Sequence, residues 1–107
     1  MIPIIHRPKH HQITIEGHAQ SAPKGEDLVC AGVSTIFHTL TANAMGWKEL
    51  GYLRDLQIQE NDGSARIAWI PYSPWKNILD AIADGVCKGF EILARDYPEY
   101  VRFERRG

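Results

Sequence analysis

The stretch EGHAQSAPKGEDLVCAGVS, residues 16–34, predicts both where the first helix of this chain begins and where its chemistry lies. Alternating polar and apolar residues end at Glu16, His18 follows, and Cys30 lies in the predicted first turn of a helix. The positive end of a helix dipole favours a thiolate, and a histidine beside it can take the thiol proton and later return it. We therefore hypothesise a nucleophilic Cys/His site in this stretch.

The length and the charge balance limit the fold and the partners of the chain. With 107 residues, the chain is predicted to form a single domain over residues 1–107. Its 12 Lys and Arg against 13 Asp and Glu give a formal net charge of −1, which argues against a nucleic-acid partner. We recognise no export signal, and no stretch approaches the ~18 continuous apolar residues of a spanning helix. We therefore expect a cytoplasmic protein with no membrane partner.

The pattern of apolar residues predicts six elements in the order β-α-β-β-α-β. This order is typical of an α+β fold in which two helices pack on a mostly antiparallel four-stranded sheet. The segment Asn61-Asp62-Gly63 has the residue types of a hairpin turn between two of the strands. The predicted ranges are 11–16, 53–60, 65–71 and 100–104 for the strands, and 28–44 and 74–97 for the helices.

Cap residues and apolar stripes define the two helices. Asp27 is the expected N-cap of the first helix and Gly46 its expected C-cap, whereas Ser73 is the expected N-cap of the second. The stripe predicted to be buried comprises Val29, Val33, Ile36, Phe37, Leu40 and Ala44 in the first helix, and Trp75, Ile78, Leu79, Ile82, Val86, Phe90 and Leu93 in the second.

The two cysteines of the chain occupy different positions relative to these stripes. Cys30 lies at the edge of the first stripe, where a thiol is partly accessible. Cys87 points away from the second stripe, and we interpret it as a surface or interface thiol rather than a catalytic one. Reduced thiols are favoured in a chain without an export signal. A disulfide between the two cysteines, or a thiol switch that uses both, stays open at this point.

The spacing of one cysteine and one histidine does not by itself single out catalysis. Buried cysteines commonly act as small hydrophobes, and a histidine at a strand end is usually polar surface. The wider pattern is more specific. Gly17-His18-Ala19, then Gly25, then the run from Asp27 to Ser34 (DLVCAGVS) resembles the signature of the ribosomal-processing cysteine protease family, Prp. The segment DYPEY at residues 96–100 is also similar to that family.

The resemblance implies a cysteine endopeptidase with Cys30 as nucleophile and His18 as general base. Members of the family are compact homodimers that remove a short N-terminal extension from a large-subunit ribosomal protein. Relatives encoded in phage genomes imply a virion precursor as another substrate. The implied partners of this chain are therefore the N-terminal peptide of a precursor protein and a second copy of the chain.

Residues around Cys30 are expected to support the chemistry. The backbone amides at the start of the first helix, near Cys30 and Ala31, are candidates for the oxyanion hole. Asp27 caps the helix, orients His18, or does both. Ser34 lies one turn beyond Cys30, where it either lines the substrate pocket or bonds back to its own backbone. Gly17 and Gly25 belong to the motif and are expected to shape the chain on either side of the loop.

No cofactor or metal is expected from the sequence. His6, His10 and His11 are candidate metal ligands, but His10 and His11 are adjacent and point to opposite sides of an extended chain, and no Cys or acidic partner lies close by. His38 lies ~12 Å along the helix from Cys30, too far for a general base. The alternative function is a non-catalytic homodimeric interaction module with the same fold. Its surface would use aromatic residues that we expect to be exposed, namely Trp47, Tyr52 and Tyr72.

Overall fold

The computed structural model describes residues 1–17 and 26–107, and the side chains of the second range from Asp27 onward. In these residues the chain forms five strands, two α-helices and two short 3-10 helices. The elements are β1 (Ile2–Arg7), η1 (Pro8–His10), β2 (Gln12–Glu16), α1 (Glu26–Glu49), β3 (Leu53–Asn61), β4 (Ser64–Pro71), η2 (Ser73–Trp75), α2 (Lys76–Asp96) and β5 (Val101–Arg105).

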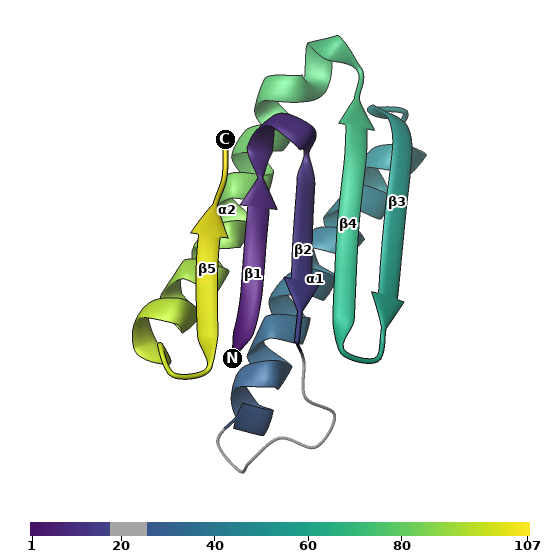
Figure 1. Cartoon of the computed structure of the whole chain (residues 1–107). Coiled ribbons are helices and arrows are strands. Elements are labelled where there is room, and N and C mark those ends of the chain that lie inside the picture. The colour runs from purple at the N-terminus through teal and green to yellow at the C-terminus, as the bar shows by residue number, and fades with distance from the viewer. Residues whose placement is uncertain (18–25) are drawn as a thin grey trace.

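The strands form one mixed sheet in the order β3-β4-β2-β1-β5, and both helices lie on the same face of it (Figure 1). Neighbouring strands are antiparallel except for β1 and β5, which are parallel. The predicted α+β fold with two helices on a mostly antiparallel sheet is confirmed. The predicted number of four strands is wrong, because β1 adds a fifth.

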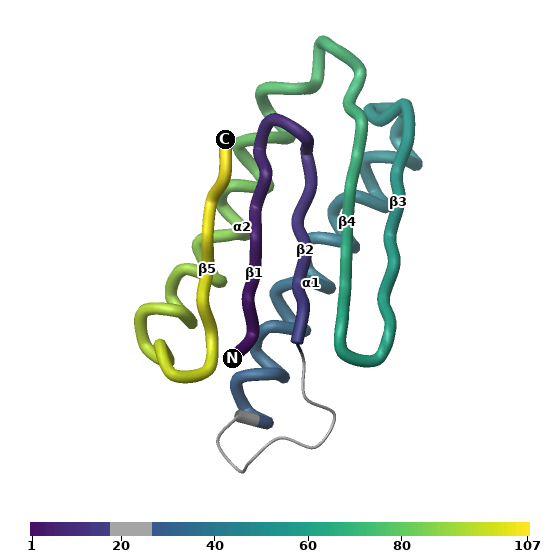
Figure 2. Tube along the Cα trace, in the orientation of Figure 1, coloured from purple at the N-terminus to yellow at the C-terminus, as the bar shows by residue number. Residues whose placement is uncertain are grey.

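Strand β1 was missed because Pro3 interrupts its apolar run. Proline is tolerated at the beginning of a strand, where its missing N–H costs no ladder bond. Pairing with β2 begins one residue later, at Ile4 opposite Ile15. In β1, Ile2, Ile4 and His6 alternate toward the buried face. The N-terminal strand therefore lies between β2 and β5, as the tube in Figure 2 shows.

The hairpin between β3 and β4 is the element that the sequence predicts best. Asn61 pairs with Ser64, so the turn consists of Asp62 and Gly63 alone. Gly63 has a φ of 90°, a left-handed conformation that glycine adopts without strain. This turn lies at the same end of the sheet as the beginning of α1 (Figure 1).

Helix α1 packs on the sheet through the face predicted from its periodicity. Val33, Phe37 and Leu40 are fully buried in the single core cluster of the described residues. By length and a mean hydropathy of 1.3 over its best window, Asp27–Glu49 could also cross a membrane, but core helices pass this weak criterion as well. The predicted exposure of Trp47 is wrong, because the indole is buried against Trp69 of β4. Tyr72 is exposed, and Tyr52 stacks on Trp75.

The end of α1 differs from the prediction that Gly46 caps it. The helix continues to Glu49, and Gly51 has a left-handed φ of +82°. The N–H of Tyr52 bonds to the carbonyl of Trp47, and that of Gly51 to the carbonyl of Lys48. These two bonds form a Schellman motif, so the true C-terminal glycine is Gly51.

Substitution of each of the two glycines by alanine tests whether α1 ends at Gly51 rather than at Gly46. Gly46→Ala is expected to stabilise the protein by about 1 kcal/mol, because alanine is the better residue in a helix interior. A Cβ at Gly46 would meet nothing within 4 Å. Gly51→Ala is expected to destabilise it by about 1–2 kcal/mol, because the left-handed conformation strains an L side chain. Urea unfolding measures both, and a lower midpoint for Gly46→Ala than for Gly51→Ala would contradict this helix end.

Helix α2 begins later than predicted and is rotated relative to the predicted stripe. Ser73 and Pro74 lie in η2, and the α-helix begins at Lys76, so Ser73 is not its N-cap. Ile78 and Ile82 are 56% and 38% exposed. The residues of α2 that are buried on the sheet are Leu79, Ala83, Cys87 and Phe90.

Candidate active site

Cys30 is the fifth residue of α1 and lies half-buried against the hydrophobic core. It therefore lies just beyond the first helical turn rather than in it, at the edge position expected from the periodicity. A half-buried thiol is held by its surroundings and still offers a face to a substrate. The predicted partner His18 lies outside the described residues, and so does Gly25.

Gly17 leads the chain out of β2 in a conformation that requires glycine. Its φ is +74°, and a Cβ added here would lie 3.2 Å from the carbonyl oxygen of Met1. A side chain would be strained by the backbone and crowded by β1 at the same time. Gly17 thus fixes the path of the chain where it leaves the sheet.

Asp27 and Ala31 both lie within the first two turns of α1. Asp27 lies inside α1, so it is not the N-cap, although a carboxylate near a helix start still interacts favourably with the dipole. In a helix that begins at Glu26, the N–H groups of Cys30 and Ala31 bond to the carbonyls four residues earlier. The unpaired amides of an α-helix belong to its first four residues, which lie N-terminal to Cys30.

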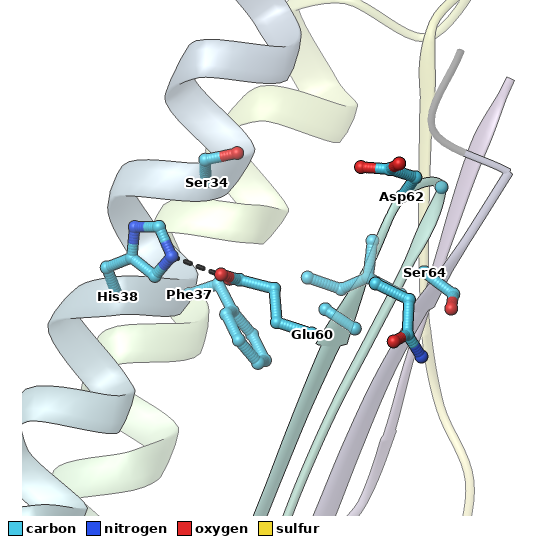
Figure 3. A pocket seen from close by; sticks show the side chains of 10 residues that line it. Ser34, Phe37, His38, Glu60, Asp62 and Ser64 are labelled. Atoms are coloured by element: carbon cyan, nitrogen blue, oxygen red, sulfur yellow. Dashed lines mark hydrogen bonds and ion pairs between the residues drawn. The ribbon is translucent and has the colours of Figure 1, made fainter. Parts of the chain in front are cut away.

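One turn beyond Cys30, a pocket of about 380 Å³ opens between α1 and the β3–β4 hairpin. Ser34 and His38 of α1 form one wall, and Asp62 and Ser64 of the hairpin face them (Figure 3). Ser34 thus lines the pocket. Elsewhere in α1 the side chains of Thr35, Thr39, Thr41 and Asn43 bond back to a carbonyl three or four residues earlier.

The hairpin wall of this pocket was not predicted. Glu60 of β3 reaches across it, and Nε2 of His38 donates a hydrogen bond to Oε1 of Glu60 at 2.6 Å (Figure 3). Both side chains are about half exposed, at 57% and 50%. The two residues are 22 positions apart, and no local pattern in the sequence connects them.

The family model of the cysteine protease Prp matches residues 1–102. This chain belongs to the Prp family of cysteine proteases. The ribosomal processing cysteine protease Prp of Mycoplasma pneumoniae is 30% identical over 95 residues, which cover 89% of this chain and 87% of that protein. The resemblance found in residues 16–34 therefore extends over nearly the whole chain.

Solved structures have the same Prp fold. The crystal structure of SMU.848 from Streptococcus mutans is 27% identical, with a TM-score of 0.69 over 97% of this chain and 90% of that one. The essential ribosomal processing protease Prp from S. aureus, in complex with a substrate peptide, is 20% identical. Its TM-score is 0.78 over 99% of this chain and 100% of that one.

The second thiol of this Prp-family chain is chemically unlike a nucleophile. Both Cys30 and Cys87 are thiols. Cys87 is 3% exposed, so the prediction of a surface or interface thiol is wrong, and burial raises its pKa to about 12. Asp84 and Glu91 contribute further to this raised pKa, because nearby negative charge disfavours the thiolate.

Alkylation is expected to distinguish the two thiols. In the folded protein at pH 8, iodoacetamide should label Cys30, whereas Cys87 should react roughly 1,000-fold more slowly than an ordinary exposed cysteine. Trypsin places the two residues in separate peptides, 25–48 and 77–88, so mass spectrometry reads each site independently. In urea both should be labelled. Equal labelling of both thiols in the folded protein would contradict this arrangement.

Two of the N-terminal histidines, His6 and His11, lie close to carboxylates of α2. Nδ1 of His11 lies 2.9 Å from a carboxylate oxygen of Asp80, and Nδ1 of His6 lies 3.9 Å from Asp84. Burial lowers the pKa of His6, which keeps this imidazole neutral in the core, and Asp84 partly opposes the shift. Within residues 1–17 and 26–107, no three His, Cys, Asp or Glu side chains are arranged to hold a metal ion.

Proposed function

We propose that this chain is a cysteine endopeptidase that removes a short N-terminal extension from a ribosomal precursor protein, with Cys30 as nucleophile and His18 as general base. The observation that carries the proposal is the half-buried Cys30 thiol near the start of α1, with a pocket one turn further along the same helix. The M. pneumoniae relative, a ribosomal processing cysteine protease, supports this substrate class. Such a substrate places the reaction in the cytoplasm.

The reaction follows the general course of thiol proteases. His18 takes the proton of Cys30, and the thiolate attacks the scissile carbonyl carbon. The C–N bond then breaks, and the proton on His18 passes to the leaving amine. Water attacks the resulting thioester while His18 accepts a proton from it, and the Cys30 thiol is released with the carboxylic acid product.

The charge that develops on the carbonyl oxygen requires hydrogen-bond donors. The N–H groups at the start of α1 are the donors we assign to this role, because the first amides of an α-helix have no partner within the helix itself. Asp27 lies in the same part of the helix and is the candidate to orient His18. Gly17, with its left-handed φ of +74°, directly precedes His18 in the sequence.

We further propose that two copies pair through α2. Ile78, Ile82 and Ile92 are exposed and lie within one face of this helix, where a monomer would leave them in water. Sedimentation velocity of the whole chain tests this: we expect the mass of two chains, and Ile82→Glu should shift the species toward one chain. A single-chain mass at micromolar concentration would contradict the pairing.

Cleavage of defined peptides tests the proposed function. Synthetic N-terminal peptides of large-subunit ribosomal precursors, together with peptides of phage virion precursors, are incubated with the protein and analysed by mass spectrometry. We expect one specific cut in a ribosomal peptide, absent with Cys30→Ala and with His18→Ala. A cut only in virion peptides would reassign the substrate. Binding of the peptides without any cut would favour the non-catalytic interaction module.

A further inference from the structure

The pocket between α1 and the β3–β4 hairpin lies on the same helix as Cys30. Ser34 on its wall is four residues from Cys30, a rise of about 6 Å along the helix. An extended peptide advances about 3.3 Å per residue. Consider a substrate that runs along α1 with its scissile carbonyl at Cys30. The side chain about two residues from its scissile bond would then lie at the mouth of the pocket.

The floor and the mouth of this pocket differ in polarity. Ile15, Phe37 and Ala65 line the floor and belong to the buried core. The mouth carries the carboxylates of Glu60 and Asp62 together with the imidazole of His38 (Figure 3). An apolar floor below a polar mouth fits a long side chain that has an apolar stem and a polar head.

The charge at the mouth favours a cationic head. Among the described residues that line the pocket there is no lysine or arginine. Glu60 accepts one hydrogen bond from His38, and a carboxylate has about four acceptor sites, so capacity for a second donor is left. Asp62 lies on the facing hairpin turn and adds a second negative charge to the same opening.

From these observations we propose that the pocket is a substrate subsite selecting a lysine or arginine side chain near the scissile bond, with Glu60 and Asp62 as its specificity-determining residues. The proposal rests on the proposed protease function, since it assigns a role to a pocket on the helix of Cys30. The stem of the substrate side chain enters the pocket, and its ammonium or guanidinium group meets the two carboxylates at the mouth.

Peptide cleavage tests the selectivity. A cleaved peptide is varied at each position from the fourth residue before the scissile bond to the third residue after it. At each position, one peptide carries lysine and another carries norleucine, whose side chain has a similar stem but no charge. At one position within about two residues of the bond, lysine should raise kcat/KM roughly fivefold over norleucine, as a partly exposed ion pair allows. In the double variant Glu60→Gln, Asp62→Asn this ratio should fall to about one at low salt.

The variants are chosen to preserve the hairpin. Asn-Gly is the preferred pair of a two-residue turn, so Asp62→Asn keeps the turn chemistry, and Glu60→Gln keeps the side-chain shape. Glu49→Gln, an exposed substitution at the far end of α1, is the matched control and should leave the lysine-to-norleucine ratio at its wild-type value. A ratio near one in the wild-type protein, or a raised ratio that survives in the double variant, overturns the subsite.

A binding measurement separates this proposal from the proposed function. Acetyl-Ala-Lys-Ala-Ala-amide and its norleucine counterpart are titrated into the Cys30→Ala chain, and amide shifts of Ser34, Asp62 and Gly63 are followed by NMR. We expect larger, saturable shifts with the lysine peptide. If no peptide is cleaved by the wild type but these shifts appear, the protease function fails, whereas the selectivity of the pocket for a cationic side chain stands. If neither cleavage nor lysine-dependent shifts appear, both are overturned.

Discussion

Replacing Cys30 by alanine is expected to lower kcat/KM for the cleaved peptide by at least roughly 10,000-fold, because removal of a nucleophile leaves only binding and electrostatic contributions. The fold should persist, since Cys30 is only half-buried and the substitution removes a single sulfur atom from the edge of the core. Steady-state kinetics on an internally quenched peptide, with far-ultraviolet circular dichroism to check folding, measure the effect.

Cys87→Ala is the matched control for this substitution. Cys87 lies on the buried face of α2, so its replacement is expected to lower the free energy of unfolding while kcat/KM per folded molecule stays at the wild-type value. If Cys30→Ala kept activity within tenfold of the wild type, or if Cys87→Ala lost as much as Cys30→Ala, the assignment of the nucleophile would be wrong.

Replacing Phe37 by alanine is expected to lower the free energy of unfolding by about 3–5 kcal/mol. Phe37 is 1% exposed and lies where α1 meets the sheet, so its removal leaves a cavity that the surrounding core cannot fully close. The loss is a large part of the stability of an ordinary small domain, which is about 5–15 kcal/mol. Urea unfolding followed by tryptophan fluorescence measures it.

A surface substitution on the same helix gives the reference for Phe37→Ala. Thr39 is exposed two residues further along, and Thr39→Ala is expected to change the free energy of unfolding by no more than about 0.5 kcal/mol. Similar unfolding midpoints for the two variants would contradict the position of Phe37 at the centre of the core.

The sequence predicts correctly those elements whose formation depends on residues close together in the chain. The hairpin follows from Asn61, Asp62 and Gly63, because these residue types tolerate the backbone angles of a tight turn. The buried face of α1 follows from its regular apolar spacing. The end of α1 was misplaced because Gly46 and Gly51 are both plausible C-terminal glycines, and only the bonds made by Gly51 and Tyr52 distinguish them.

The buried face of α2 and the presence of strand β1 depend on tertiary packing, which the sequence pattern does not reveal. In α2, apolar residues cover more of the helix than the sheet can bury, so the sequence does not say which part of the band faces inward. Ala83 and Cys87 are buried against the sheet, whereas Ile78 and Ile82 are exposed. Strand β1 was hidden by Pro3, which is harmless at its place in the sheet.

The candidate site also has one part that the sequence predicts and one part that only the folded chain reveals. The sequence around Cys30 predicts that the thiol lies at the edge of a helix stripe, because the helix and its apolar stripe are formed by residues near Cys30 in the chain. The pocket beyond it depends on Glu60 and Asp62, which approach α1 only when the hairpin folds against that helix. Such a contact is a product of the whole topology, so no motif in residues 16–34 could have indicated it.

The central claim is that Cys30 forms a covalent acyl intermediate with the substrate. Acid quenching during the first turnovers with a cleaved peptide, followed by digestion and mass spectrometry, tests this claim most directly. We predict that the mass of the N-terminal fragment of the substrate is added to the tryptic peptide 25–48, on Cys30, and that it decays as product accumulates. Continued cleavage with no adduct on this peptide, or an adduct on peptide 77–88, would contradict the claim.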